Sequence, residues 1–318
     1  ILLREEVYRA TQGKIDFFQT PKFVRIARYG KKIQMNEGVC PAYSDCRMGL
    51  SPDRFILSYC DRALGITSAE EQPVLPKGNN LSLHLLELFT SRVAKVGMTD
   101  GIRQVLQEES DALRAYYEQA GILIARPAGG TSCRLAISAQ GGTNAENHNH
   151  NDVGSYAVAL GSETMVGDQG GPNSYPGDYF NGDAPQKYKI KGSFGHPVPV
   201  VDGRTQSSGG KAKGVVLQKE FTNEKDVFSI NYTSAYSTPN LDKLIRTFVY
   251  DRQGKGNFTV GDEFTAKTPI RFETAITTRA DWKVLDDTHL LLATDSEQMI
   301  VAIEASGKVA FTSETIEV

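Results

Sequence analysis

The sequence predicts an α+β chain of two domains, with helices over residues 1–120 and a large antiparallel β-sandwich over residues 121–318. The first third contains dense apolar segments without β-branched residues, which favours helices. From residue 121 onward, short apolar runs alternate with turn signals, as in antiparallel sandwiches. A chain of 318 residues is long enough for both domains, because a domain usually holds roughly 100–200 residues.

Three segments carry the helical prediction. Ser51-Pro52 is a typical helix start, with the serine as N-cap and the proline in the first turn, and Gly65 is expected to end that helix. Residues 80–89 have the composition of a helix, and His84 within them is expected to be a packed histidine. Residues 111–120 could supply a final helical turn or two before the domain boundary.

The strand prediction rests on apolar runs separated by turns such as Asp202-Gly203. The runs are 122–126, 133–137, 156–160, 198–201, 214–218, 227–232, 247–250, 257–260, 270–274, 289–293 and 299–302. One stretch, residues 168–195, breaks the rhythm because it is rich in Gly, Asn, Pro and Tyr. Loops longer than roughly 12–15 residues inside a domain are usually functional or disordered, and here we expect a functional loop.

Composition excludes several classes of protein. Hydrophobic residues make up 40% and charged residues 23%, which is ordinary for a globular chain. A net charge of -3 argues against nucleic acid as a partner, whereas an acidic polysaccharide needs only a local basic patch. No apolar run is long enough to span a membrane. The chain begins with Ile1 and without a visible signal peptide, so we expect a fragment or a processed product.

The four cysteines form no Cys-x-x-Cys pair, which argues against a zinc ribbon. Cys40 and Cys46 could close a small loop in an oxidising compartment, and free thiols are the alternative.

Histidines gather in the predicted β-domain. His148 and His150 are two residues apart, and in an extended segment both side chains would point the same way. Asp168 ends one short run and His196 opens another, and sites are often built at strand ends. Two histidines and a carboxylate can hold Zn²⁺ with a fourth position free. The alternative is that these histidines are surface or hydrogen-bonded loop residues.

Four blocks of sequence carry a resemblance to a known family. Residues 141–156 (GGTNAENHNHNDVGSY), 166–171 (VGDQGG) and 195–203 (GHPVPVVDG) resemble the signature of heparinase II/III-like polysaccharide lyases. Upstream, residues 116–126 (YYEQAGILIAR) resemble the family's entry into its β-domain. The resemblance is clear over about residues 110–215, and over the rest it extends only to the general pattern of short apolar runs and turns.

The resemblance implies an N-terminal (α/α) toroid followed by an antiparallel β-sandwich. Residues 1–120 would then be the last helices of an incomplete toroid. It also implies that His150, Asp168 and His196 are the metal ligands and that His148 lies at the catalytic cleft. Because the family takes a further Tyr, His and Asn from the toroid, this chain alone is not expected to be a complete enzyme. A bacterial, periplasmic or secreted protein is implied as well.

The implied reaction is β-elimination at a uronic acid unit of an acidic polysaccharide. A base removes the C5 proton, an acid protonates the leaving oxygen, and the carboxylate must be neutralised. His148 could neutralise the carboxylate or act as the base. Tyr175 and Tyr179, in the long loop, could donate a proton or stack on a sugar ring, and loop packing is the alternative.

Asn147, Lys187 and Arg204 are the candidate substrate-binding residues. Lys187 alternates with two further lysines up to residue 191, so the three ammonium groups would share one face of a strand and could meet a sulfate or uronate. The alternative is a solvated strand edge protected by lysines. Asp152 could orient an imidazole or simply belong to a turn.

A different class of function is also compatible with the sequence. The sandwich could be a non-catalytic glycan-binding or structural module that holds a structural metal. A cupin-type metal enzyme fits less well, because it would need a Glu soon after the His-x-His pair and none occurs before Glu163. Elimination creates a C4–C5 double bond that absorbs ultraviolet light, so absorbance separates a lyase from a binding module.

Overall fold

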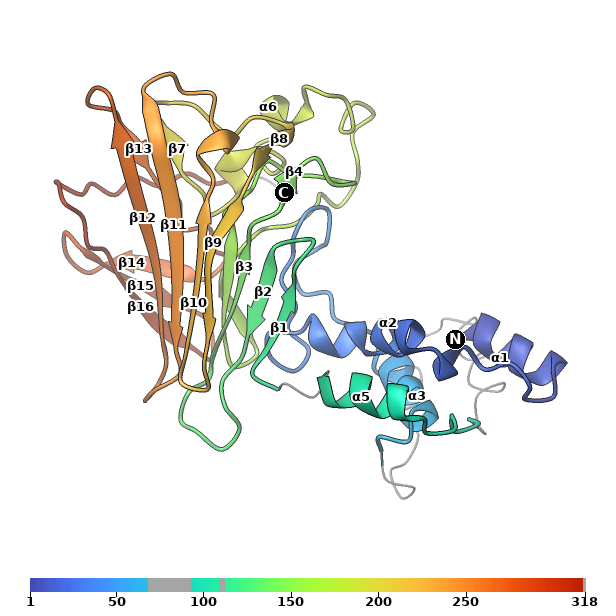
Figure 1. Ribbon diagram of the computed structural model, residues 1–318. Helices are drawn as coiled ribbons and strands as arrows, with labels where there is room; N and C mark the ends of the chain where they lie inside the picture. The colour runs from blue at the N-terminus through green and yellow to red at the C-terminus, as the bar shows by residue number, and fades with distance from the viewer. Residues whose placement is uncertain (68–92, 109–111, 317–318) are drawn as a thin grey trace. The chain divides into compact units, whose positions relative to one another are not determined.

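The computed structural model describes residues 1–67, 93–108 and 112–316. The chain divides into two compact units: a helical unit of Ile1–Ile33 and Ser51–Ala112, and a β unit of Gln34–Leu50 and Leu113–Val318 (Figure 1). No helix in these described ranges is long and apolar enough to cross a membrane.

The helical unit packs around a small apolar core that includes Val24, Tyr59 and Ile102. Its described elements are α1 (Leu2–Ala10), η1 (Phe17–Gln19), α2 (Pro21–Lys32), α3 (Arg54–Ala63) and α5 (Asp100–Glu108). The N-cap of α3 is Asp53, whose side chain accepts from two backbone amides, so the expected Ser51 cap is wrong. A carboxylate accepts such bonds well and also favours the positive end of the helix dipole. The helix predicted over residues 80–89 lies outside the described residues.

Residues 111–120 are not the end of a helix, as the sequence suggested. Strand β1 (Arg114–Tyr117) pairs antiparallel with β2 (Ile122–Ala125). Gly121, at φ 62°, lies in the connection between the two strands. The Tyr116 ring packs edge-on against two phenylalanine rings of the β unit, so burial against the sheets overrides the local helical composition.

Two antiparallel sheets form the sandwich, which confirms the predicted fold class. The five-stranded sheet has the order β1-β2-β3-β5-β6, and the four-stranded sheet has the order β12-β11-β10-β9. Their further strands are β3 (Leu135–Gln140), β5 (Tyr156–Leu160), β6 (Glu163–Val166), β9 (Val215–Phe221), β10 (Lys225–Asn231), β11 (Leu241–Asp251) and β12 (Asn257–Ala266). Apolar side chains of both sheets share one core, in which the rings of Tyr156 and Phe248 lie 6.2 Å apart.

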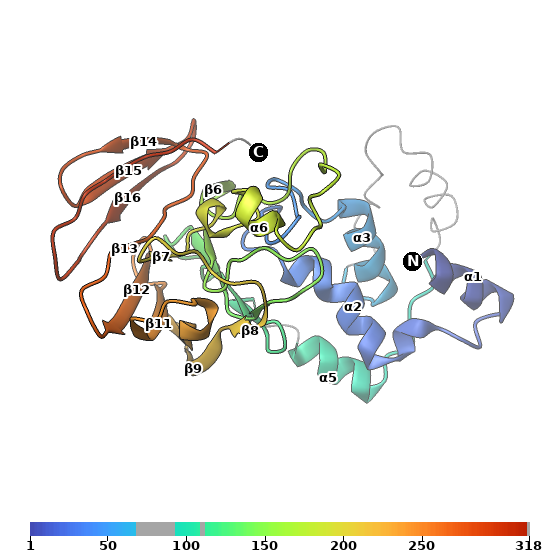
Figure 2. The ribbon, with the colours of Figure 1, turned by 90° about the horizontal axis from the view of Figure 1, so that it is seen from above.

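Smaller elements complete the β unit. They are β4 (Thr143–Asn144) paired with β8 (Gly209–Lys213), β7 (Val200–Val201) paired with β13 (Phe272–Glu273), the sheet of β14 (Asp281–Val284), β15 (His289–Ala293) and β16 (Gln298–Ala302), and the short helices α6 (Ala184–Lys187), η2 (Ser193–Gly195) and η3 (Thr233–Ala235). Figure 1 and Figure 2 show the long loop with α6 lying away from the β14–β16 sheet. Residues 187–191 form no strand, so the predicted lysine-lined strand edge is wrong.

Residues 34–50 belong to the β unit although they precede α3 in the chain. The hydroxyl of Tyr43 donates to Ser138 Oγ at 2.8 Å, and the Asn36 side chain donates to the carbonyl of Gly161 at 2.8 Å. These bonds fix the segment against the five-stranded sheet. Cys40 and Cys46, within it, are free thiols.

Candidate metal centre and adjoining histidine

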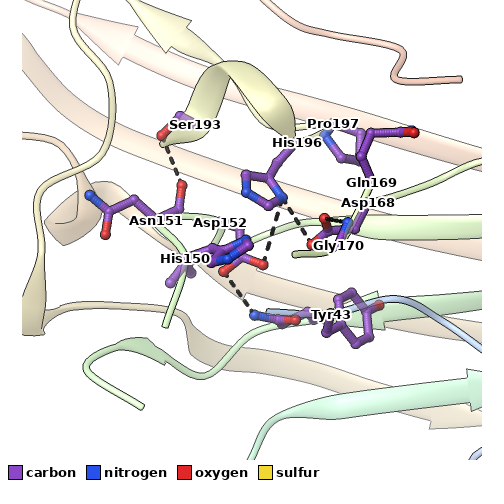
Figure 3. A network of polar contacts seen from close by, with 12 residues as sticks. Tyr43, His150, Asn151, Asp152, Asp168, Gln169, Gly170, Ser193, His196 and Pro197 are labelled. Carbon is purple, nitrogen blue, oxygen red and sulfur yellow. Dashed lines mark hydrogen bonds and ion pairs between the residues drawn. The ribbon is translucent and has the colours of Figure 1, made fainter. Parts of the chain in front are cut away.

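Three side chains converge inside the β unit (Figure 3). His150 comes from the loop after β4, Asp168 from the end of β6, and His196 from the residue after η2. Their ligand atoms all lie within 4.8 Å of one another, and each residue is at most 1% exposed. The structure therefore brings together the three residues expected to bind a metal.

Several polar atoms at this point lack hydrogen bonds. His150 Nδ1, Asp168 Oδ2 and both ring nitrogens of His196 are buried without a hydrogen-bond partner among the described residues. His196 Nδ1 lies 2.9 Å from Asp168 Oδ2, but the pair does not have hydrogen-bond geometry. Unsatisfied buried polar groups are costly. A cation at this point would satisfy His150 Nδ1, Asp168 Oδ2 and one ring nitrogen of His196, because each residue offers one ligand atom. Two imidazoles and a carboxylate are a donor set that fits Zn²⁺.

A second carboxylate faces the same point. Asp152 Oδ2 lies 4.0 Å from His196 Nδ1 and is also without a hydrogen-bond partner, whereas Oδ1 accepts from Gln140 at 3.1 Å. Burial raises the pKa of Asp152 to about 6. Burial alone would lower the pKa of His196, but the carboxylates of Asp168 and Asp152 outweigh it and raise that pKa to about 9. Asp152 is thus part of the buried cluster and not merely a turn residue.

Two polar side chains fix the loops that carry the histidines. Gln206 donates to the carbonyl of Val153 at 2.7 Å and accepts from its amide at 2.9 Å, which holds the backbone just after His150. Arg246 is fully buried and donates to the carbonyls of Gly154 at 2.8 Å and Pro197 at 2.7 Å. One guanidinium therefore holds the chain close to both histidines of the candidate metal site.

Asp45 completes the site and was not expected from the sequence. Its Oδ2 lies 2.6 Å from His148 Nδ1, and its Oδ1 lies 3.1 Å from His150 Nε2. Gly170 and Gly171 let the backbone of residues 45–46 come this close. A Cβ at Gly170, which has φ 73°, would lie 1.9 Å from the Cys46 carbonyl oxygen.

The charge of Asp45 decides which nitrogens carry protons. Partial burial raises its pKa, but hydrogen bonds from His150 and His148 outweigh burial and hold the pKa below its ordinary value. The ionised carboxylate only accepts hydrogen bonds, so His148 Nδ1 and His150 Nε2 act as the donors. This leaves Nε2 of His148 without a proton in its neutral form, and leaves Nδ1 of His150 as the nitrogen available to a metal.

His148 does not lie in an extended strand, as the two-residue spacing suggested. It adopts φ 56° in a turn, its side chain is 59% exposed, and its ring packs edge-to-face with that of Phe180, with 5.1 Å between the ring centres. The two histidines thus differ in exposure but share Asp45. His148 lines an open cavity of about 250 Å³, whose other lining residues include Phe180 and Lys191.

The two tyrosines of the long loop differ in accessibility. Tyr179 is fully buried, and its hydroxyl lies 3.2 Å from Asp45 Oδ1 and 3.3 Å from His150 Nε2. Burial and the Asp45 charge raise the pKa of Tyr179 well above its ordinary value. The phenol of Tyr179 therefore contacts both Asp45 and His150. Tyr175 is 46% exposed and packs against Tyr179 and Phe180.

The expected substrate-binding residues lie outside the cavity. Asn147 and Arg204 are exposed, and neither they nor Lys187 line the cavity beside His148. Lys187 is paired with Asp178, and Lys189 is paired with Glu314. Lys191, which the sequence placed on the same strand face, is instead buried.

Comparison with solved structures finds a similar fold in a heparan sulfate lyase and in a heparinase III. A heparan sulfate lyase from Pedobacter heparinus is similar with a TM-score of 0.56 and 13% identity, over 87% of this chain and 38% of that one. A heparinase III structure is similar with a TM-score of 0.58 and 16% identity, over 93% of this chain and 43% of that one. No protein-family model matches the chain, and no curated protein matches it.

These likenesses establish the fold. Because the sequence identities are low, the likenesses show the architecture of helices followed by an antiparallel sandwich, and they assign no role to any residue. The chain spans about two fifths of the length of these two lyases.

Proposed function

We propose that this chain is part of a polysaccharide lyase that cleaves a uronic-acid-containing polysaccharide by β-elimination. The observation that carries the proposal is the pairing of His148 with Asp45. An ionised carboxylate on Nδ1 leaves Nε2 able to accept a proton, and the ring lines an open cavity. The fold shared with heparan sulfate lyases supports this assignment.

In the proposed reaction, His148 Nε2 takes the C5 proton of the uronic acid unit. The electrons of the C5–H bond form the C4–C5 double bond, and the C4–O bond breaks. The leaving oxygen takes up a proton from an acid. Tyr175 is the exposed phenol of the long loop and is the candidate acid within this chain. Asp45 stabilises the imidazolium that forms on His148, as the carboxylate does in other His–Asp pairs.

We further propose that His150, Asp168 and His196 hold one divalent ion, Zn²⁺ in the first instance. Zinc can act as a Lewis acid or as a structural ion. The burial of all three residues favours the structural role, because a substrate carboxylate would have to reach atoms that are at most 1% exposed. The ion would hold together the loop after β4, the end of β6 and the residue after η2. It would thereby keep His150 and Asp45 in fixed positions relative to His148.

A non-catalytic glycan-binding module remains the second candidate, because the chain spans only part of the lyases it resembles. Ultraviolet absorbance separates the two. The full-length protein is incubated with a panel of uronic acid polymers, and a lyase gives rising absorbance from the new double bond. Binding without absorbance for every polymer in the panel would favour the module. A periplasmic or secreted location is part of the proposal and is tested by fractionating the source cells.

A further inference from the structure

Lys191 is a buried cation that the proposed reaction has not yet used. It is 6% exposed, and its Nζ donates to the backbone carbonyl of Tyr179 at 2.8 Å. The ammonium lies 4.5 Å from the centre of the Tyr179 ring and 4.9 Å from that of Phe180. Among the ion pairs of the described residues, Lys187 and Lys189 each have a carboxylate partner, and Lys191 has none. An ammonium carries three donors, and the Tyr179 carbonyl accepts from one of them.

Lys191 lines the same cavity as His148. Phe180 connects the two, because its ring contacts both the His148 ring and the Lys191 ammonium. The other acidic or basic side chain lining this cavity is Glu146, which is exposed and accepts from Thr143 at 3.1 Å. The cavity therefore offers one buried cation, Lys191, beside the imidazole of His148, and the carboxylate that lines it belongs to the exposed Glu146.

The position of Lys191 is fixed by its backbone. Its carbonyl accepts from the Asn151 amide at 2.9 Å, and its amide donates to the Tyr188 carbonyl at 2.9 Å. The first bond ties Lys191 to the loop that carries His148 and His150. Burial lowers the pKa of Lys191, whereas the Asp45 carboxylate opposes this and favours the charged form.

We propose that Lys191 binds the carboxylate of the uronic acid unit whose C5 proton His148 removes. This inference rests on the proposed function. Loss of the C5 proton places negative charge on the carboxylate, and a fixed cation in a partly desolvated site stabilises that charge strongly. The neighbouring asparagine amides of the cavity suit sugar hydroxyls, whereas Lys191 suits a carboxylate. The site would then select uronic acids over neutral sugars.

Binding is measured by titration calorimetry with the full-length protein carrying His148→Ala, so that no polymer is cleaved. The probes are heparan sulfate, desulfated heparan sulfate and alginate, each with native and with chemically reduced carboxyl groups. Lys191→Met is compared with unchanged Lys191. Lys189→Met is the matched control, because Lys189 is an exposed lysine of the same segment.

We expect the protein with Lys191 to bind the native form of at least one polymer roughly 10–100-fold more tightly than its carboxyl-reduced form. Lys191→Met should remove that preference, Lys191→Arg should keep part of it, and Lys189→Met should keep all of it. A preference that survives Lys191→Met, or that is absent with Lys191 in place, overturns the inference. A preference that follows sulfate instead of carboxylate overturns it as well. If Lys191→Met unfolds, Lys191→Gln replaces it in the same comparison.

The two proposals fail separately. Carboxylate-dependent binding through Lys191, with no ultraviolet absorbance from any polymer and an intact His148, would leave the carboxylate contact of Lys191 standing and remove the lyase proposal. If Lys191→Met leaves the ultraviolet-detected turnover unchanged, the lyase proposal stands and the role of Lys191 is removed.

Discussion

Each carboxylate oxygen of Asp45 contacts a different histidine: Oδ2 lies 2.6 Å from His148 Nδ1, and Oδ1 lies 3.1 Å from His150 Nε2. His150 belongs to the candidate metal site, and His148 lines the cavity. A single carboxylate therefore orients a candidate ligand and a candidate base. Carboxylate–histidine–metal arrangements of this kind set the tautomer and the orientation of the ring.

This relationship predicts how Asp45→Asn differs from two single histidine variants. His148→Ala should lower lyase turnover of the full-length protein by roughly 10²–10⁴-fold and leave metal content unchanged. His150→Ala should release the metal. Asp45→Asn should lower the turnover in part and should also weaken metal affinity by roughly 10–100-fold. Turnover on a uronic acid polymer and elemental analysis check the three.

The pattern across the variants is what decides the roles. If His148→Ala and His150→Ala lose metal equally, His148 is a ligand and its assignment as base is wrong. If Asp45→Asn leaves both turnover and metal affinity unchanged, Asp45 orients neither histidine. Asp183→Asn, at an exposed acidic residue of the long loop, is the control.

The metal itself should be measurable directly. Protein purified without chelator should contain about one equivalent of Zn²⁺ per chain, because all ligands are present in the folded state. Asp168→Asn should lower the zinc content and the melting temperature together, since the ion joins three separate loops. Removing the ion with a chelator should lower the melting temperature of the unchanged protein and have little further effect on Asp168→Asn. Equal melting temperatures with and without the ion would contradict the structural role.

The strands were largely predictable, and the segment that completes the site was not. Runs such as 156–160 and 289–293 match β5 and β15 residue for residue, because apolar content between turn signals is a local property. Residues 34–50 lie in the helical third of the sequence, and nothing local indicates that they pack on the sheet. Asp45 is 103 residues from His148, so its role depends on the tertiary fold.

The candidate site was predictable to a similar extent. The two-residue spacing and the strand-end positions drew attention to this region, and the resemblance to heparinase II/III-like lyases implied His150, Asp168 and His196 as the ligand set, which the structure brings together. Burial could not be inferred in the same way. Tyr179 and Lys191 have the sequence context of exposed loop residues, yet both are buried, and Lys191 Nζ donates to the Tyr179 carbonyl within the long loop.

The pKa of His196 predicts a specific pH dependence of stability for the metal-free protein. Its pKa is about 9 in the folded state, because the charges of Asp168 and Asp152 outweigh burial, against 6.5 when unfolded. A group whose pKa is raised on folding stabilises the folded state fully below 6.5, and this contribution is lost as the pH rises through 9. The urea concentration at the unfolding midpoint of the chelated protein should therefore decrease as the pH is raised from 6.5 to 9.

The metal-loaded protein is the internal control for this titration. A coordinated His196 carries no proton on its ligand nitrogen, so the fall between pH 6.5 and 9 should be absent or much smaller. A metal-free protein with a constant midpoint across this range would show that the two carboxylates do not hold a proton on His196.

Gly170 should be intolerant of even the smallest side chain. Its φ of 73° is unfavourable for residues with a Cβ, and the added atom would lie 1.9 Å from the Cys46 carbonyl oxygen. Gly170→Ala must therefore displace the backbone that carries Asp45, at a cost of at least about 1–2 kcal/mol in the free energy of unfolding. The matched control is Gly177→Ala in the same loop, where a Cβ would meet nothing within 4 Å. We expect Gly170→Ala to lower the urea midpoint and the lyase turnover, and Gly177→Ala to change neither. If Gly170→Ala is as stable and as active as Gly177→Ala, residues 45–46 do not lie against this turn, and the link between Asp45 and the two histidines fails with it.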